Sequence, residues 1–421
     1  MMKSFKNPLL ARYKKTVLVW VIYLAGIALS CAMAWALGAN DATNPTDCAV
    51  GAGVISLKKA LTIFAIFSAI GGVLVGSFVM KTFDRGIVDR KTGIETGTLS
   101  KECLVLGSLV AALSAVIWVT VSTWLGMPVS TTHSTVGAIL GFGLATRPEL
   151  IVWSRVKQVL IGIIASPTLS LILAVGIFYL VRRVFSRVSR KGTTTVASSI
   201  LFFIFFITSI TVVKILIRET WKIVLTSVAV SLPVSLVFLA LALRWKEEWR
   251  EKTLGFLLIL ALAFSAFAFG ANDLANATGV FVTPTEIMIG KPTRTTMFLL
   301  SVLGSLFIAL GGLTWGRKVL ATAAYKITRL DPVTGLSAEL ANALCVFLFT
   351  TVPAWLTGFG LPISTTHSSV GSIIGVGLAS GGIGHVHGGT TKKILAFWAL
   401  TIPCTTLISA GIFRLISGVI L

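Results

Sequence analysis

Residues 126–144 read GMPVSTTHSTVGAILGFGL, and residues 360–378 read GLPISTTHSSVGSIIGVGL. The two blocks are identical at 13 of 19 positions, so the chain contains an internal duplication. In each block a Pro and a run of Ser and Thr precede a Gly-rich apolar segment. Because these residue types are typical of the start of a helix, each block predicts a short helix that begins at its hydroxyl residues.

A second motif precedes each block at nearly the same distance. Residues 38–41 and 270–273 both read GAND, and these strings start 88 and 90 residues before their blocks. Gly, Asn and Asp are poor residues for a helix interior, so we expect GAND to interrupt a long apolar helix in each half. Duplicated polar interruptions at matched positions are typical of a secondary transporter whose site lies between two repeats.

The composition is that of a membrane protein. The chain is 55% hydrophobic and 12% charged, and its mean hydropathy is +0.93. Two short Gly- and Ser-rich segments, near 128–145 and 362–380, predict half-helices or re-entrant elements. We therefore predict an all-α polytopic membrane protein with ten to twelve crossings. The apolar runs long enough to span a bilayer lie at about 16–37, 60–80, 103–125, 157–181, 198–217, 223–243, 254–269, 296–316, 340–357 and 394–418.

The duplication divides the chain into three parts. We predict a first transport repeat with a basic N-terminal segment over 1–145, and intervening transmembrane helices with a basic loop over 146–253. The second repeat and a C-terminal helix occupy 254–421. The net charge of +21 lies mainly between apolar runs, which favours contact with anionic lipid headgroups over nucleic acid. The first span has a counterpart at 254–269, so we expect it to be retained and not cleaved as a signal peptide.

The two GAND acids are the strongest candidates for ion binding. Asp41 and Asp273 stand in apolar sequence, where an ionisable side chain is costly and is a functional candidate by default. Unwound carbonyls together with Asn and Asp oxygens would suit Na⁺, whereas Ca²⁺ or Mg²⁺ would need more carboxylates. A purely structural carboxylate is the alternative. The predicted sodium ligands are Asn40, Asp41, Asn44, Asn272, Asp273 and Asn276.

The hydroxyl blocks predict an anion site. If a half-helix begins after Pro128 and another after Pro362, the first-turn N–H groups and the positive dipole end of each would face the site. Two such ends across a pseudo-two-fold axis could hold a tetrahedral oxyanion without Lys or Arg. The alternative is that these Ser and Thr residues only pack between close helices.

Weaker signals surround these motifs. Glu102 and Glu339 follow related strings, and each is equally well explained as a coupling acid or as an acid at a helix end. His133 and His367 are candidates for coupling or phosphate binding, or they satisfy a helix end. A membrane hydrolase would need one asymmetric nucleophile–base pair, but the chain has two equivalent blocks, so we do not expect an enzyme. A channel is a further alternative.

The paired GAND-x-x-N strings and paired P-[VI]-S-T-T-H-S blocks resemble the inorganic phosphate transporters of the PiT type. The resemblance spans roughly 16–145 and 254–380, although Thr43 and Pro45 stand where the family commonly has small residues. It implies about 12 transmembrane helices in two inverted repeats with broken or re-entrant half-helices. It also implies a phosphate site at the repeat interface. The resemblance places Asp41, Asn44, Asp273, Asn276 and the two S-T-T blocks at this site. The residues that we predict to bind phosphate are Thr43, Ser130, Thr131, Thr132, Ser364, Thr365 and Thr366.

The function that we predict from the sequence is import of inorganic phosphate coupled to Na⁺ by alternating access. Co-transported Na⁺ would bind at the Asp41 and Asp273 clusters, and no cofactor is expected. We place the protein in the plasma (inner) membrane as a multi-pass protein, with a homodimer as an assembly suggested by analogy. A proton-coupled phosphate or metal–phosphate carrier, or a sulfate carrier of the same fold, is the alternative.

Overall fold

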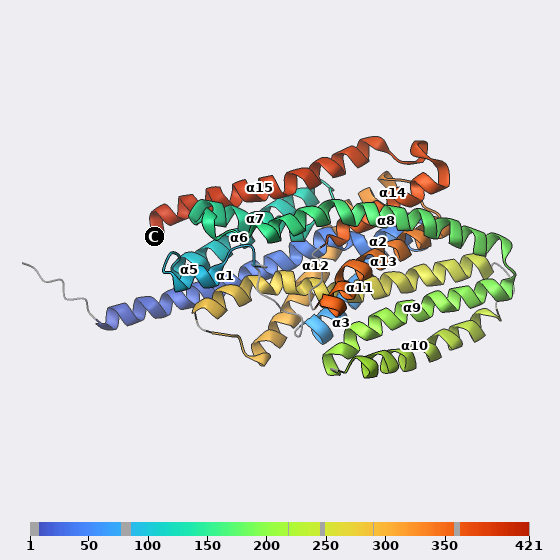
Figure 1. The fold of residues 1–421 in the computed structure, drawn as a ribbon, viewed down its shortest axis with the longest axis horizontal. Helices are drawn as coiled ribbons and strands as arrows, with labels where there is room; N and C mark the ends of the chain where they lie inside the picture. The colour runs from blue at the N-terminus through green and yellow to red at the C-terminus, as the bar shows by residue number, and fades with distance from the viewer. Residues whose placement is uncertain are drawn as a thin grey trace, which may run out of the picture.

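A computed structural model of the chain describes residues 8–76, 86–217, 219–244, 249–288, 290–357 and 363–420. Regular structure in these ranges is helical, apart from two isolated bridges, Val88–Ile151 and Thr328–Val386. Pro362 and the N-terminal residues 1–7 lie outside the described residues. In chain order the elements are α1 (Pro8–Asp41), α2 (Thr43–Gly51), α3 (Leu57–Gly71), the π-helical turn η1 (Gly72–Gly76), α5 (Arg90–Glu95), α6 (Lys101–Trp124), α7 (Thr131–Thr146), η2 (Pro148–Leu150), α8 (Trp153–Arg187), α9 (Arg190–Leu216), α10 (Thr220–Ala242), α11 (Trp249–Met288), α12 (Arg294–Lys326), α13 (Pro332–Thr357), α14 (Thr365–Gly381), η3 (Ile383–His385) and α15 (Gly388–Ile420) (Figure 1).

The predicted membrane spans are confirmed. Ten helical segments in the described ranges are long and apolar enough to cross a membrane, and they coincide with the ten apolar runs of the sequence. Helix α11 lies in the interior, since 56% of its most apolar window is buried, whereas only 22% is buried in α8 and α10. Side chains such as Ile164 and Leu407 are more than 70% exposed, as lipid-facing residues of outer helices are.

The helix starts predicted from the duplicated blocks are also confirmed. Helix α7 begins at Thr131 with Ser130 as its N-cap, and α14 begins at Thr365 with Ser364 as its N-cap. Each cap hydroxyl accepts a hydrogen bond of 3.2 Å from the backbone N–H three residues later. With 16 and 17 residues, both helices are shorter than the spans around them, as expected for half-helices.

The prediction that GAND unwinds its helix is wrong. Helix α11 runs without interruption through residues 270–276. In the first half only Ala42 separates α1 from α2, and its backbone keeps right-handed helical angles of φ −53° and ψ −22°. Carbonyl oxygens of an unwound stretch are therefore not offered to a cation, and ligand oxygens at these motifs come from side chains.

Helix packing explains why the two glycines of GAND stand within helices. A Cβ added at Gly38 would overlap the backbone carbonyl oxygen of Ile308 on α12. A Cβ at Gly270 would overlap the carbonyl oxygen of Ser68 on α3 in the same way. Small residues that let backbones approach closely are a common packing device in membranes. The Gly residues of the motif thus bring together helices of different halves and do not break their own helix.

The two halves exchange contacts reciprocally. Helix α1 packs on α12 while α11 packs on α3, and α7 packs on α15 while α14 packs on α8. Helix α7 also packs on α6, and α14 on α13, so each S-T-T block begins a helix that lies between one helix of its own half and one helix of the other half. The hairpin of α9 and α10 lies at one edge of the molecule, beside the N-terminal part of α11, and leaves this central arrangement uninterrupted (Figure 1).

Candidate functional site

The side chain of Asp41 joins the two hydroxyl blocks. Its Oδ2 accepts a hydrogen bond of 3.0 Å from the Thr131 hydroxyl at the start of α7. Its Oδ1 accepts one of 3.2 Å from the Thr366 hydroxyl in the first turn of α14. Asp41 is only 2% exposed, so these contacts lie deep in the protein. Blocks that are more than 230 residues apart in the sequence therefore meet at a single carboxylate.

Asn44 strengthens the same junction. Its amide Nδ2 donates to the hydroxyls of Thr365 and Thr366, each at 3.2 Å. Asn44 follows Asp41 by three residues, so both side chains lie on one face of the nearly continuous α1–α2 helix. The side-chain oxygen of Asn44 is buried and has no hydrogen-bond partner among the described residues. A buried amide oxygen of this kind is available to a ligand.

Asn40 has a different set of contacts. Its Nδ2 donates to the Thr123 hydroxyl at 2.8 Å and to the Met127 carbonyl at 3.1 Å. Its Oδ1 accepts from the backbone N–H of Val129 at 3.0 Å. These bonds fix the segment between α6 and α7, whose backbone groups have no regular helical partners. Through these contacts Asn40 positions the segment before α7. Whether Asn40 also ligates sodium stays a prediction from the sequence.

The second GAND motif lies close to the first. Asp273 on α11 is near enough to Asp41 for the two carboxylates to interact electrostatically. The amide Nδ2 of Asn276 donates to Asp273 Oδ1 at 3.1 Å, which repeats the Asp–Asn spacing of the first motif. The side chain of Asn272 lies outside what the structure describes. Two carboxylates near one another in a membrane interior favour cation binding, because a cation between them offsets their repulsion.

The helix starts supply the donors for an anion. The N–H groups of Thr131 and Thr132 are in the first turn of α7, where the helix itself offers them no acceptor. Thr365 and Thr366 hold the same positions in α14. Thr43, also predicted to bind phosphate, is 1% exposed, and its hydroxyl has no hydrogen-bond partner among the described residues. The two helix ends therefore carry N–H groups and hydroxyls without any Lys or Arg of their own.

The two block histidines lie against each other. The ring centroids of His133 and His367 are 4.8 Å apart. His367 also stacks on Trp398 of α15, with centroids 3.7 Å apart and an angle of 18° between the rings. The Trp398 indole donates to the Pro128 carbonyl at 3.0 Å and so ties α15 to the segment before α7. Each histidine follows its cap serine by three residues and donates its backbone N–H to that serine hydroxyl. The predicted parts of the two imidazoles in coupling or phosphate binding stay predictions.

The acid pair predicted for coupling is not equivalent in the structure. Glu102 lies in the first turn of α6 and is exposed, as expected for an acid at a helix end. Glu339 is 2% exposed and accepts a hydrogen bond from the Ser265 hydroxyl. It lies beside Asp47 and Cys48 of α2.

Sequence reasoning missed Asp47. Its signal was present, because Asp47 follows GAND within the same membrane span, which runs from Val19 to Gly51. The first Lys or Arg after it in the chain is Lys58, so no neighbouring cation in the sequence accounts for it.

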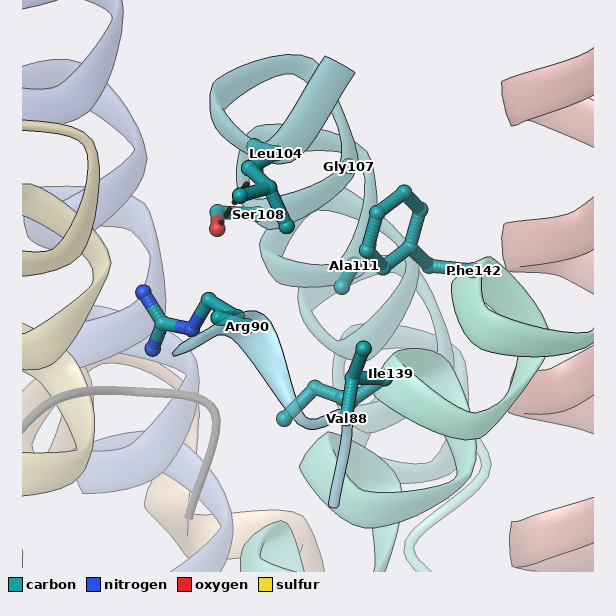
Figure 2. A pocket seen from close by; sticks show the side chains of 8 residues that line it. All are labelled: Val88, Arg90, Leu104, Gly107, Ser108, Ala111, Ile139 and Phe142. Carbon is teal, nitrogen blue, oxygen red and sulfur yellow. Dashed lines mark hydrogen bonds between the residues drawn. The ribbon is translucent and has the colours of Figure 1, made fainter. Parts of the chain in front are cut away.

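A small cavity elsewhere is not part of this site. It lies between α6, α7 and the segment at Val88 and Arg90, and Figure 2 shows Leu104, Ile139 and Phe142 in its wall. The space is about 10 Å³, which is at the lower limit for one water molecule. It is therefore too small for an oxyanion.

Comparisons with known proteins show which family the chain resembles. A model of the phosphate transporter family matches residues 37–409. A candidate phosphate permease of Pyrococcus abyssi is 35% identical over 408 residues, which cover 93% of this chain and 97% of that protein. One of Haemophilus influenzae is 30% identical over 419 residues, covering 94% and 96%.

A solved structure is also similar. It is described as the sodium-dependent phosphate transporter, and it is 31% identical to this chain. The likeness covers 95% of this chain and 100% of that one, with a TM-score of 0.82. The helical arrangement described above is thus shared over essentially the whole chain.

Proposed function

The chain belongs to the phosphate transporter family, and from this premise we propose that it is a secondary active symporter that imports inorganic phosphate together with Na⁺ by alternating access. The observation that carries the proposal is the position of Asp41, which accepts hydroxyl hydrogen bonds from both blocks. A cation on this carboxylate and an anion on these hydroxyls would be immediate neighbours. Binding of one would then change the binding of the other.

Phosphate is proposed to bind between the starts of α7 and α14. The first-turn N–H groups and the positive dipole ends of two helices favour a tetrahedral oxyanion. The hydroxyls of Thr131, Thr132, Thr365 and Thr366 add donors from both halves. Neutral donors suit a carrier, because a Lys or Arg in the membrane interior would be costly and would hold the anion tightly.

Na⁺ is proposed to bind at Asp41 and Asp273, with Asn44 and Asn276 as neutral oxygen ligands. The unpartnered side-chain oxygen of Asn44 supports this assignment. Asn carbonyls can ligate Na⁺ but carry no proton, so the clusters favour Na⁺ over proton coupling. Because the motif helices are not unwound, side chains and the ligand phosphate would complete the coordination.

Competition for the hydroxyl protons would couple the two ligands. Thr131 and Thr366 donate to Asp41, and each hydroxyl has a single proton to give. A cation on Asp41 would satisfy the carboxylate and release these protons to phosphate, and it would also offset the repulsion between two anions. A site that held phosphate without Na⁺ would have a higher free energy, because the phosphate and the carboxylates repel each other. The protein would therefore reorient either empty or fully loaded.

Transport into proteoliposomes tests the coupling ion. We expect phosphate accumulation with an inward Na⁺ gradient and strongly reduced uptake with a pH gradient in the absence of Na⁺. Undiminished uptake with the pH gradient alone would favour the proton-coupled alternative. Competition with unlabelled sulfate tests the substrate, because a sulfate carrier would lose phosphate uptake at equal concentrations of the two anions. The proposal places the protein in the plasma membrane, and it includes neither a cofactor nor a catalytic step.

A further inference from the structure

Asp47, Cys48 and Glu339 form a compact buried cluster outside the site described above. Asp47 and Cys48 lie on α2, and Glu339 lies on α13. All three side chains are at most 2% exposed, and one ligand atom of each lies within 4.8 Å of the other two. Asp47 follows Asp41 by six residues, which corresponds to about 9 Å along a helix. The cluster is therefore separate from the Asp41 carboxylate.

One carboxylate oxygen of the cluster lacks an N–H or O–H donor among the described residues. Asp47 accepts from the Cys48 N–H at 2.7 Å and from the Ser369 hydroxyl at 2.6 Å, one bond for each oxygen. Glu339 Oε1 accepts from the Ser265 hydroxyl. Glu339 Oε2 is buried and accepts no N–H or O–H hydrogen bond among the described residues, and the Cys48 thiol beside this carboxylate is only a weak donor. An acceptor buried in this way is costly unless a ligand satisfies it.

The charge of the cluster is not balanced by protein cations. Ion pairs among the described residues, such as Lys91–Glu95 and Arg147–Glu149, are exposed. Within the described ranges, neither Asp47 nor Glu339 has a Lys or Arg partner of this kind. Two carboxylates so close together in a low-dielectric interior require compensation. With Cys48 as a thiolate the three ligands would carry three negative charges, so a divalent ion would leave one of them uncompensated and a monovalent ion would leave two.

The donor atoms select the class of divalent ion. Ca²⁺ and Mg²⁺ prefer six or more oxygen ligands, which a cluster of two carboxylates and a thiol does not provide. A thiolate sulfur with carboxylate oxygens suits a transition-metal ion. Ligand bonds of about 2.0–2.3 Å would place the donor atoms about 3.3–3.6 Å apart. Small side-chain movements would bring atoms now within 4.8 Å to that separation.

We propose that Asp47, Cys48 and Glu339 bind one divalent transition-metal ion, such as Zn²⁺ or Co²⁺, which joins the two halves of the protein. Asp47 and Cys48 belong to the first half and Glu339 to the second. Their hydroxyl partners Ser369 on α14 and Ser265 on α11 extend the link to two more helices of the second half. The ion would reach the site from the end of α2 at Gly51, since the segment that follows is partly exposed.

Cobalt binding to the purified full-length protein tests this proposal. Co²⁺ is titrated in buffer free of phosphate and Na⁺, so the result does not depend on the proposed transport function. We expect one equivalent of Co²⁺ per chain and a near-ultraviolet charge-transfer absorption from the Cys48 thiolate. Addition of Zn²⁺ should displace Co²⁺ and remove the absorption, because this class of site binds Zn²⁺ more tightly than Co²⁺.

Matched variants assign the ligands. Cys48→Ser should lose the charge-transfer absorption, while Cys345→Ser, which replaces another buried thiol, should retain it. Asp47→Asn and Glu339→Gln should each weaken Co²⁺ binding by at least about tenfold, since loss even of an outer-shell partner costs about 10–100-fold in metal affinity. His387→Ala, which removes an exposed loop histidine, should bind Co²⁺ as the unmodified protein does.

Several outcomes would overturn the proposal. The absence of saturable Co²⁺ binding to the unmodified protein would do so directly and requires no variant. Binding that survives both Asp47→Asn and Glu339→Gln, or that is lost in His387→Ala, would place the metal elsewhere. Displacement of Co²⁺ by millimolar Na⁺ would assign the cluster to a monovalent ion.

Discussion

Replacing Asp41 by Asn tests how cation and phosphate binding are linked. The Asn side chain keeps the size of Asp and can still accept a hydrogen bond from the Thr131 or Thr366 hydroxyl, which now donate to the carboxylate at 3.0 and 3.2 Å. It removes the negative charge that would repel phosphate and attract Na⁺. We therefore expect phosphate affinity in this variant to depend much less on Na⁺, with Asp273 supplying the dependence that remains.

The size of the effect follows from the charges. Two unit charges about 4 Å apart interact by about 4 kcal/mol at an effective dielectric constant of about 20. This energy is equivalent to a factor of about 10³ in affinity. Solvent near the charges or a larger distance between them would lower this factor. We expect Na⁺ to raise phosphate affinity by at least about 100-fold in the unmodified protein, and by at least about tenfold less in Asp41→Asn, where only the repulsion from Asp273 remains.

The assay is equilibrium binding of labelled phosphate to purified protein, without Na⁺ and at saturating Na⁺. Asp89→Asn is the matched control, because Asp89 is partly exposed and lies between membrane spans. Its carboxylate accepts from the Thr92 N–H at 3.0 Å, and this hydrogen bond lowers the pKa of Asp89. Asn is an equally good N-cap, so this control should behave as the unmodified protein. Full Na⁺ dependence in Asp41→Asn would refute the reasoning.

Two further substitutions test the second motif and the packing of the halves. Asp273→Asn should lower the Na⁺ activation of uptake and the maximal phosphate uptake together, measured in proteoliposomes; normal transport would contradict the proposed coupling. Gly38→Ala should destabilise the protein by about 1–3 kcal/mol, because the new methyl group meets the backbone of Ile308, which cannot rotate away. Thermal unfolding followed by tryptophan fluorescence measures this effect. Gly176→Ala on α8, which has open space around it, should leave the melting temperature unchanged or raise it slightly.

Local patterns were sufficient to predict the helix starts at the two blocks. The order Pro, Ser, Thr before an apolar segment depends on capping chemistry within four residues, and the structure confirms Ser130 and Ser364 as caps. The membrane spans were predictable for a similar reason, since length and hydropathy are properties of a continuous segment. The packing of the two halves against each other was predictable from the duplicated motifs.

The continuation of the helices through the GAND motifs was not predictable from helix propensity. Gly, Asn and Asp disfavour a helix in isolation, but tertiary contacts override this preference. Gly38 is used for close backbone approach, and Asn40 bonds to the segment before α7 and not to its own helix. The importance of Asp47 was also missed, because its partner Glu339 lies almost 300 residues away in the sequence. Such contacts become visible only when the helices are assembled.

The central claim is that hydroxyls from both halves bind the same phosphate ion. Its most direct test is phosphate binding at saturating Na⁺ to Thr131→Val, Thr366→Val and the double variant. Each single variant should lose about 10–100-fold in affinity, because a hydrogen bond to a charged group contributes about 1.5–3 kcal/mol. The double variant should depart from additivity by at least about 0.5 kcal/mol, since both hydroxyls contact one ligand and one carboxylate. Unchanged phosphate affinity in either single variant would contradict a site shared between the two halves.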